Sequence, residues 1–288
     1  MKTNVKILIA CHKPCEVPQN NVYTPIHVGR SVSKYKSEMS WMIGDDTGDN
    51  ISAKNNFYCE LTAQYWAWKN LKNVSYIGLC HYRRYFQIEF KNENIEALFA
   101  NKFDVILNKS DIKPTNVGHH LMECTTKEDF YIFLASIKIV SPEYYEAAIN
   151  YLTQNIVIGY NMFVMPYECF CKFAEWQFSV LSEMEKLVRL SGYTLVKRIY
   201  GYFGEALLPI YYKANRMKIH YLDIVPMLGM SYNKPITQVL GNLRSNLFFH
   251  SKKKETFCEA AVINGLNQDF PNTNLVINLP KANETIIK

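Results

Sequence analysis

The feature that most constrains the fold of this chain is a series of short apolar runs that each end in a cluster of polar side chains. Short apolar runs bounded by turn residues are typical of strands that are buried on both faces of a sheet. The first three runs are residues 5–10, 41–43 and 76–80, and the polar clusters that follow them are residues 11–13, 45–50 and 81–84. Each predicted strand therefore carries polar side chains to its carboxyl end.

Helical patterns lie between and after these strands. In residues 57–71, Leu61, Tyr65 and Trp68 fall at i, i+4 and i+7, which predicts a helix with these side chains on one face. Residues 167–190 have the pattern of a long amphipathic helix. Its apolar stripe contains Phe170, Phe173, Val180, Met184 and Leu187. Strands that alternate with helices predict an α/β fold with a mostly parallel sheet flanked by helices.

The length and composition fit a globular α/β protein. The chain has 288 residues, and we place one domain at residues 1–230 and a helical C-terminal extension at residues 231–288. The net charge of +6 fits an anionic ligand or membrane surface but is too small to indicate nucleic-acid binding. The eight Cys show no CxxC spacing, and no apolar segment is long enough for a signal peptide or a membrane span. We therefore expect a reduced, cytoplasmic protein.

Three polar clusters follow predicted strands, and this arrangement indicates a ligand site. If the strands are parallel, their carboxyl ends meet at one edge of the sheet, where α/β folds bind ligands. The first cluster contributes His12 and Lys13.

The acidic turn GDDTGDN contributes Asp45, Asp46, Asp49 and Asn50. Short carboxylates can accept hydrogen bonds from ribose hydroxyls or a base N–H, which favours nucleoside recognition. Two alternatives stay open. Three carboxylates this close could bind a divalent metal, or the segment could be a tight turn that caps a helix.

The segment HYRRYF contributes His81, Arg83 and Arg84. Arginine pairs bidentately with phosphate oxygens and stays charged when partly buried, so we expect this segment to hold an anion. The alternative is an exposed arginine pair at a sheet edge. Neighbouring residues of a strand point to opposite faces, so both arginines reach one ligand only if the strand ends before them.

Two further residues are candidates for the same site. Asn161 opens an apolar strand, where it either faces a ligand or completes a turn. Glu205 is placed in the first turn of a helix, where the helix dipole favours an ionised carboxylate suited to a general base. A glutamate that merely stabilises the first turn of its helix is the alternative.

Several segments together resemble bacterial capsular and exopolysaccharide glycosyltransferases, a family catalogued as a domain of unknown function in polysaccharide gene clusters. The segments are KILIACHKP, IGDDTGDNISAKNNFYCELTAQYWAWKN, YIGLCHYRRYF, YNMFVM and YGYFGEALL, and the resemblance runs from about Lys6 to Met227. It implies a GT-A type, Rossmann-like sheet and transfer of a hexose from a UDP-sugar, with galactopyranose or galactofuranose as the first sugar to test. A glycan or lipid-linked oligosaccharide would be the acceptor.

The chain departs from the pattern of such enzymes at two places. Where a DxD metal motif usually ends a strand, this sequence has His81, Tyr82 and Arg83. Cationic side chains can replace the metal that neutralises a leaving diphosphate. We therefore assign no metal ligand, although Mn²⁺ or Mg²⁺ on the acidic turn stays open. Inverting members carry an acidic pair where this chain has Gly204 and Glu205, so an inverting mechanism with Glu205 as base is favoured but not fixed.

The C-terminal extension has an apolar helical pattern followed by lysines. Val239, Leu240, Leu243 and Leu247 lie near helical spacing ahead of residues 252–254, which are all lysine. This pattern indicates either a peripheral contact with the inner face of the plasma membrane or a helix that packs on the domain. An alternative for the whole chain is a non-catalytic nucleotide- or carbohydrate-binding module of a polysaccharide assembly system.

Overall fold

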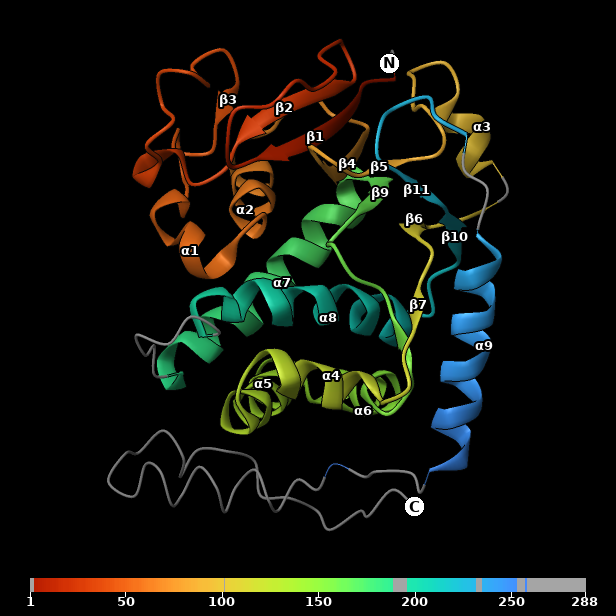
Figure 1. The fold of residues 1–288 in the computed structure, drawn as a ribbon. Coiled ribbons are helices and arrows are strands. Elements are labelled where there is room, and N and C mark those ends of the chain that lie inside the picture. Colours follow the sequence, from red (N-terminus) through yellow and green to blue (C-terminus); the bar gives the residue numbers. More distant parts are fainter. Residues whose placement is uncertain (1–2, 101, 189–195, 232–234, 253–256, 258–288) are drawn as a thin grey trace. The chain divides into compact units, whose positions relative to one another are not determined.

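A computed structural model describes residues 3–100, 102–188, 196–231, 235–252 and 257 (Figure 1). The chain divides into two compact units that are each built from separate segments of sequence. The sheet unit consists of Met1–Ser110, Ile158–Glu175 and Arg216–Lys234, and the helical unit of Asp111–Val157, Trp176–Asn215 and Pro235–Lys288. Local sequence patterns did not indicate this division, and the boundary expected at residue 231 stays a prediction.

The sheet unit contains a seven-stranded sheet in the order β10-β6-β9-β4-β1-β2-β3. The strands are β1 (Val5–Cys11), β2 (Tyr23–His27), β3 (Ile43–Gly44), β4 (Tyr76–His81), β6 (Val105–Asn108), β9 (Phe163–Pro166) and β10 (Ile219–Leu222). β9 pairs antiparallel with β4 and β6, and the other pairings in this sheet are parallel. The predicted α/β fold with a mostly parallel sheet is confirmed. A small antiparallel pair joins β5 (Tyr85–Phe86) to β11 (Ile224–Val225).

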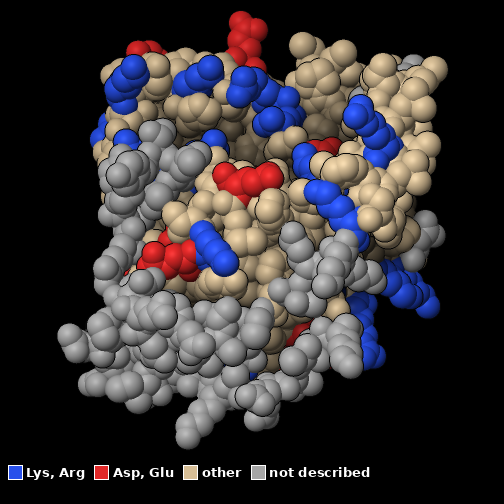
Figure 2. Space-filling model, turned by 60° about the horizontal axis from the view of Figure 1, so that its bottom comes forward, with Lys and Arg blue, Asp and Glu red and all other residues tan. Residues whose placement is uncertain are grey.

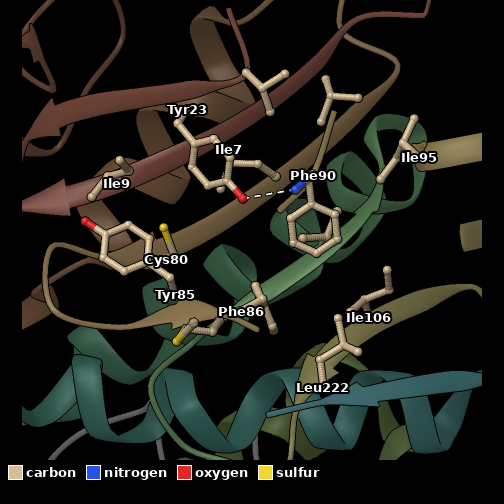
Figure 3. Packing of buried hydrophobic residues seen from close by; sticks show 14 of the residues in the cluster. Ile7, Ile9, Tyr23, Cys80, Tyr85, Phe86, Phe90, Ile95, Ile106 and Leu222 are labelled. Carbon is tan, nitrogen blue, oxygen red and sulfur yellow. Dashed lines mark hydrogen bonds between the residues drawn. The ribbon is translucent and has the colours of Figure 1, made fainter. Parts of the chain in front are cut away.

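The core of the sheet unit explains why its strands read as continuous apolar runs. Ile7 and Ile9 of β1 point into one buried cluster, while Leu8 between them is buried as well (Figure 3). A strand buried on both faces has no polar alternation to show. Inside the cluster the backbone N–H of Phe90 donates to the Tyr23 hydroxyl at 3.1 Å, so this buried phenol is satisfied.

Short helices follow the strands of the sheet unit. They are η1 (Arg30–Val32), η2 (Ser52–Lys54), α1 (Asn55–Tyr58), α2 (Leu61–Asn70) and α3 (Ile95–Phe99). The helix predicted around residues 57–71 is interrupted at Cys59, whose φ is 52° and ψ −131°. The face that Leu61, Tyr65 and Trp68 share is only partly buried, because Tyr65 and Trp68 are half-buried, whereas Trp66 is buried. Trp66 turns inward and donates from Nε1 to the Thr47 hydroxyl at 2.8 Å.

The helical unit contains most of the longer helices. Its elements are β7 (Asp111–Ile112), α4 (Val117–Cys124), α5 (Lys127–Val140), η3 (Pro142–Tyr144), α6 (Tyr145–Leu152), β8 (Ile156–Val157), η4 (Val196–Arg198), α8 (Ile199–Ala214) and α9 (Ile236–Ser251). The long helix α7 (Tyr167–Leu187) belongs to the sheet unit up to Glu175 and to the helical unit beyond it. All five residues of its predicted apolar stripe are buried, so that prediction is confirmed.

Helix α9 confirms that the C-terminal extension contains a helix, and it leaves an apolar stripe uncovered. The exposed fractions of Ile236, Val239, Leu240, Leu243, Leu247 and Phe248 lie between 49% and 77%. The helix contacts β7, and Asn155 donates to the Asn246 side chain at 3.3 Å. Lys253 and Lys254 lie outside the described residues. Within the described ranges, no helix has both the length and the apolar character that crossing a bilayer requires.

Candidate functional site

The three predicted polar clusters are brought to one edge of the sheet. Ala10 of β1 is paired with His81 of β4, and Cys11 is paired with His27 of β2. His27 is in turn paired with Gly44 of β3. Because all these pairings are parallel, the carboxyl ends of the strands are neighbours and the predicted convergence is confirmed.

A cationic and aromatic cluster forms where β1 and β4 end. The rings of His12 and Tyr82 meet edge to face with centroids 5.3 Å apart. Lys13 Nζ lies 5.8 Å and Arg83 Cζ 4.8 Å from the centroid of the Tyr82 ring. His12, Lys13 and Arg83 are exposed and can be reached by a ligand, and Lys13 and Arg83 carry positive charges. The face of Tyr82 offsets part of their mutual repulsion through cation–π attraction.

The turn after β4 decides where the two arginines point. The backbone N–H of His81 donates to the carbonyl of Arg84 at 3.2 Å, and the N–H of Arg84 donates back at 3.0 Å. This pair closes a tight turn over Tyr82 and Arg83, so β4 has ended and strand alternation no longer separates the arginines. Arg83 lies against Tyr82, and Arg84 Cζ lies 4.3 Å from the centroid of the Tyr160 ring.

The residues before β9 form the second side of this region. The His81 imidazole donates from Nε2 to the carbonyl oxygen of Tyr160 at 2.6 Å. Tyr160 and Asn161 both have left-handed backbones, with φ of 72° and 50°. Asn161 is buried and donates from Nδ2 to Oε1 of Glu60 at 2.6 Å. Sequence reasoning did not select Glu60, which gives no local signal at the start of an apolar helix.

Asp45 is fully buried and holds the loop after β2. Its carboxylate accepts from the backbone N–H of Gly29 at 2.7 Å, from the N–H of Arg30 at 3.1 Å, and from the Ser52 hydroxyl. Gly29 has a φ of 66°, a conformation that favours glycine. Asp45 therefore holds the backbone of Gly29 and Arg30 in place at this edge of the sheet.

The remaining residues of the acidic turn are partly engaged within the protein. Asp46 forms an ion pair with Arg30 at 3.8 Å. The Tyr65 hydroxyl donates to Asp49 at 3.1 Å, and both burial and this carboxylate raise the pKa of Tyr65 above its ordinary value. Asn50 donates from its side-chain amide to the carbonyl oxygen of Gly48 at 2.9 Å. Asp49 is exposed to solvent.

Two carboxylates of the acidic turn have partners within the protein. Asp45 already accepts three hydrogen bonds, and Asp46 faces an arginine. In the described residues, no three His, Cys, Asp or Glu side chains come together in a group that could hold a metal ion. Binding of Mn²⁺ or Mg²⁺ at the acidic turn stays a prediction.

One buried polar side chain near this edge was not predicted. His27 at the end of β2 is fully buried, and neither ring nitrogen has a hydrogen-bond partner among the described residues. Burial lowers the pKa of His27 below its ordinary value of 6.5, and the charge of Asp45 partly opposes this shift.

Glu205 belongs to the helical unit, whereas the other predicted site residues belong to the sheet unit. Its predicted place in the first helical turn is wrong, because α8 begins at Ile199 and Glu205 is in the second turn. The half-buried carboxylate lies near Cys124: burial chiefly raises the pKa of this thiol, and the charges of Glu123 and Glu205 add to the shift.

On the face that Figure 2 shows, Lys and Arg side chains are interspersed with Asp and Glu. The feature that stands out at the sheet edge is the cluster of His12, Lys13, Arg83 and Arg84 with two tyrosine rings.

Residues 6–216 match a family described as a domain of unknown function, DUF4422. The chain belongs to the DUF4422 family. The matched DUF4422 segment contains β1 through α8 and with them every predicted site residue, while α9 lies beyond it. No curated protein matches the sequence significantly.

The DUF4422 chain is similar to a solved structure titled as the apo form of the bifunctional glycosyltransferase WbbM. The TM-score is 0.64 and the sequence identity is 27%. The match covers 81% of this chain and 48% of that chain, so the chain spans about half the length of WbbM.

Proposed function

We propose that this DUF4422 protein is a glycosyltransferase of the GT-A type that transfers a hexose from a UDP-sugar to a glycan or lipid-linked oligosaccharide. The observation that carries the proposal is the cationic and aromatic cluster at the carboxyl edge of the sheet. The similarity to a bifunctional glycosyltransferase supports the same reading. Capsular or exopolysaccharide synthesis is the proposed setting, and galactose is the first sugar to test.

In this proposal the cationic cluster binds the diphosphate of the donor. Arg83 and Arg84 supply planar guanidinium groups, and His12 and Lys13 add donors on the β1 side. Phosphate oxygens gain negative charge when the bond to the sugar breaks, so fixed cations stabilise the leaving group more in the transition state than in the ground state. A divalent metal held by the acidic turn is the alternative source of this stabilisation.

The nucleoside is proposed to lie over the loops after β2 and β3. Asp46, Asp49 and Asn50 offer acceptors to ribose hydroxyls or a base N–H. Asp45 contributes by holding the backbone of Gly29 and Arg30 in place. Asn161 is proposed to approach the donor from the turn before β9, the strand that pairs with β4.

Glu205 is proposed as the base that takes the proton from the acceptor hydroxyl, which attacks the anomeric carbon in line and inverts it. The Glu205 side chain is half-buried, so an acceptor hydroxyl can reach its carboxylate. Its position in the second helical turn gives it little help from the helix dipole, whose effect is confined to the first turn.

The exposed stripe of α9 is proposed to contact the inner face of the plasma membrane, where a lipid-linked acceptor would be found. The apolar residues of the stripe would enter the interfacial region, and Lys252 follows directly. A lysine near an anionic surface contributes about 1 kcal/mol, so the contact would be reversible.

Calorimetric titration with UDP, first in EDTA and then with Mn²⁺, tests the proposal. We expect UDP to bind in EDTA, and Mn²⁺ should raise the affinity by no more than about two-fold, because the cationic side chains already neutralise the diphosphate. Binding that requires Mn²⁺ would overturn the cationic diphosphate site, and no binding in either condition would overturn the UDP donor.

Transfer assays separate an enzyme from a binding module. Glu205→Gln should keep UDP affinity and lose transfer by at least about a hundred-fold, as expected for loss of a general base. UDP binding without transfer of any sugar by the unaltered protein would favour the non-catalytic module instead.

A further inference from the structure

Glu60 is a carboxylate that the proposed mechanism does not use. Its exposed fraction is 8%, and Asn161 is its hydrogen-bond partner among the described residues. No lysine, arginine or histidine among the described residues forms an ion pair with Glu60. A nearly buried carboxylate without a cation is energetically costly.

The backbone around both partners of this bond is strained. Cys59, directly before Glu60, has φ 52° and ψ −131°, a region that non-glycine residues rarely adopt. Tyr160 and Asn161 are both left-handed. Backbone strain of this kind concentrates at functional sites.

Neighbouring side chains fix the strained peptide of Cys59. Asn55 donates from Nδ2 to the Cys59 carbonyl oxygen at 2.7 Å, and the Thr62 hydroxyl donates to the same oxygen at 3.1 Å. The local structure therefore holds Glu60 in one orientation rather than letting the strain relax.

The Glu60–Asn161 pair lies beside the cationic cluster of the sheet unit. Asn161 precedes β9, whose Phe163 is paired with Leu79 of β4. The backbone carbonyl oxygen of the neighbouring Tyr160 accepts the hydrogen bond from His81, and the Arg84 guanidinium lies over the Tyr160 ring. The pair is therefore next to the residues proposed to hold the diphosphate.

The acceptor atoms of Glu60 and Asn161 indicate which kind of ligand group would bind beside them. The Asn161 Oδ1 atom is buried without a hydrogen-bond partner, and the second Glu60 oxygen has none among the described residues. Both atoms are acceptors, and one carries negative charge, so they repel phosphate and attract O–H donors. A hexose attached to the diphosphate presents such hydroxyls next to the phosphate groups.

We propose that Glu60, held by Asn161, forms the subsite for the transferred sugar and accepts hydrogen bonds from its hydroxyl groups. This inference rests on the proposed function, because it takes the cationic cluster as the diphosphate site. It adds a residue that determines which sugar is bound, separate from the residues that bind UDP.

Calorimetry with UDP and with UDP-galactose, UDP-glucose and UDP-N-acetylglucosamine in EDTA tests the subsite. For Glu60→Gln we expect UDP affinity within about two-fold of the unaltered protein. The ratio of UDP-sugar to UDP affinity should fall about ten-fold or more for the preferred sugar, as for loss of a charge-assisted hydrogen bond. The matched control is Glu123→Gln, which removes an exposed carboxylate from α4 of the helical unit and should change neither affinity.

A second measurement does not depend on how the variant folds. UDP-sugar analogues with one ring hydroxyl replaced by fluorine lose a donor, and a site that binds that hydroxyl should reject one analogue by about ten-fold or more. In Glu60→Gln the discrimination against this analogue should be smaller, because a neutral amide oxygen accepts a weaker hydrogen bond than a carboxylate.

The outcomes are distinct. An unchanged affinity ratio in Glu60→Gln, or no discrimination among the analogues by the unaltered protein, overturns the sugar subsite while leaving UDP binding in place. UDP binding without binding of any UDP-sugar also overturns it. Absence of UDP binding overturns the proposed function itself, and the subsite with it.

Discussion

His81 and Tyr160 are joined by a hydrogen bond of 2.6 Å between the imidazole Nε2–H and the backbone carbonyl oxygen of Tyr160. The bond connects the residue that ends β4 to the left-handed turn before β9. Because Arg84 stacks on the Tyr160 ring, His81 also fixes the surface on which that arginine rests.

Removal of this hydrogen bond should weaken UDP binding because Arg84 loses its fixed position, not because His81 itself contacts UDP. We expect His81→Ala to weaken UDP binding about ten-fold, roughly 1.4 kcal/mol, in calorimetry. The unfolding free energy in urea should fall by about 1 kcal/mol, the typical net value of one hydrogen bond. His250→Ala, at an exposed position on α9, is the control and should leave both unchanged. Equal UDP affinity in His81→Ala and the unaltered protein would contradict the positioning role.

The two arginines after β4 should each contribute to diphosphate binding. Arg83→Ala and Arg84→Ala are each expected to weaken UDP binding by about 1.5–3 kcal/mol, as for a charge-assisted hydrogen bond. Arg244→Ala removes an exposed arginine from α9 and should not change the affinity. If both substitutions after β4 behave like Arg244→Ala, the anion is not bound there.

Asp45 and Asp49 occupy the same turn but should differ in their effect on stability. Asp45→Ala leaves two backbone N–H groups and the Ser52 hydroxyl without their acceptor in a buried loop, so we expect a loss of about 3 kcal/mol in the unfolding free energy. Asp49→Ala removes an exposed carboxylate and should cost less than about 1 kcal/mol. Urea denaturation of both variants measures the difference, and equal losses would argue against the structural role of Asp45.

A methyl group should be destabilising at Gly78 and not at Gly241. A Cβ at Gly78 would lie 2.6 Å from Ile7 Cδ1 and 2.8 Å from the Phe163 carbonyl oxygen, and that backbone atom cannot move aside. We expect Gly78→Ala to lower the unfolding free energy by about 1–3 kcal/mol. A Cβ at Gly241 on α9 meets nothing within 4 Å, so Gly241→Ala should raise helix stability by about 1 kcal/mol. Circular dichroism during urea unfolding distinguishes the two signs.

The buried His27 predicts a loss of stability at acid pH. Burial, the largest cause, lowers its pKa below 6.5, and Arg30 and Lys36 act in the same direction while Asp45 and Asp46 oppose them. Because the folded-state pKa is the lower one, protonation favours the unfolded chain. The stability that the neutral ring contributes is fully present above pH 6.5 and is lost as the pH falls through the folded-state pKa.

Substitution of this histidine should flatten the pH dependence. For the unaltered protein, the urea concentration at the unfolding midpoint is expected to decrease as the pH is lowered from about 7 to about 5. His27→Leu should show a smaller decrease over the same pH range. His250→Leu, at an exposed position, serves as the control and should retain the full decrease. A decrease in His27→Leu as large as in the control would exclude His27 as the source.

Local sequence patterns determined the elements that build this protein. The apolar runs of β1 and β4 indicate strands buried on both faces, and the stripe from Phe170 to Leu187 identifies the buried face of α7. The polar residues after each run also indicated one edge of the sheet as the candidate site. These features depend on the spacing of apolar and polar residues, which follows directly from helix and strand geometry.

Only the tertiary structure decided which of these side chains meet. Glu60 and Asn161 are 101 residues apart in the sequence, and His81 and Tyr160 are 79 residues apart. Periodicity states which face of an element is buried but not which partner covers it. The break at Cys59, the start of α8 at Ile199 and the assembly of two units from separate segments likewise depend on packing between distant residues, because strained or shifted backbone persists only where such contacts hold it.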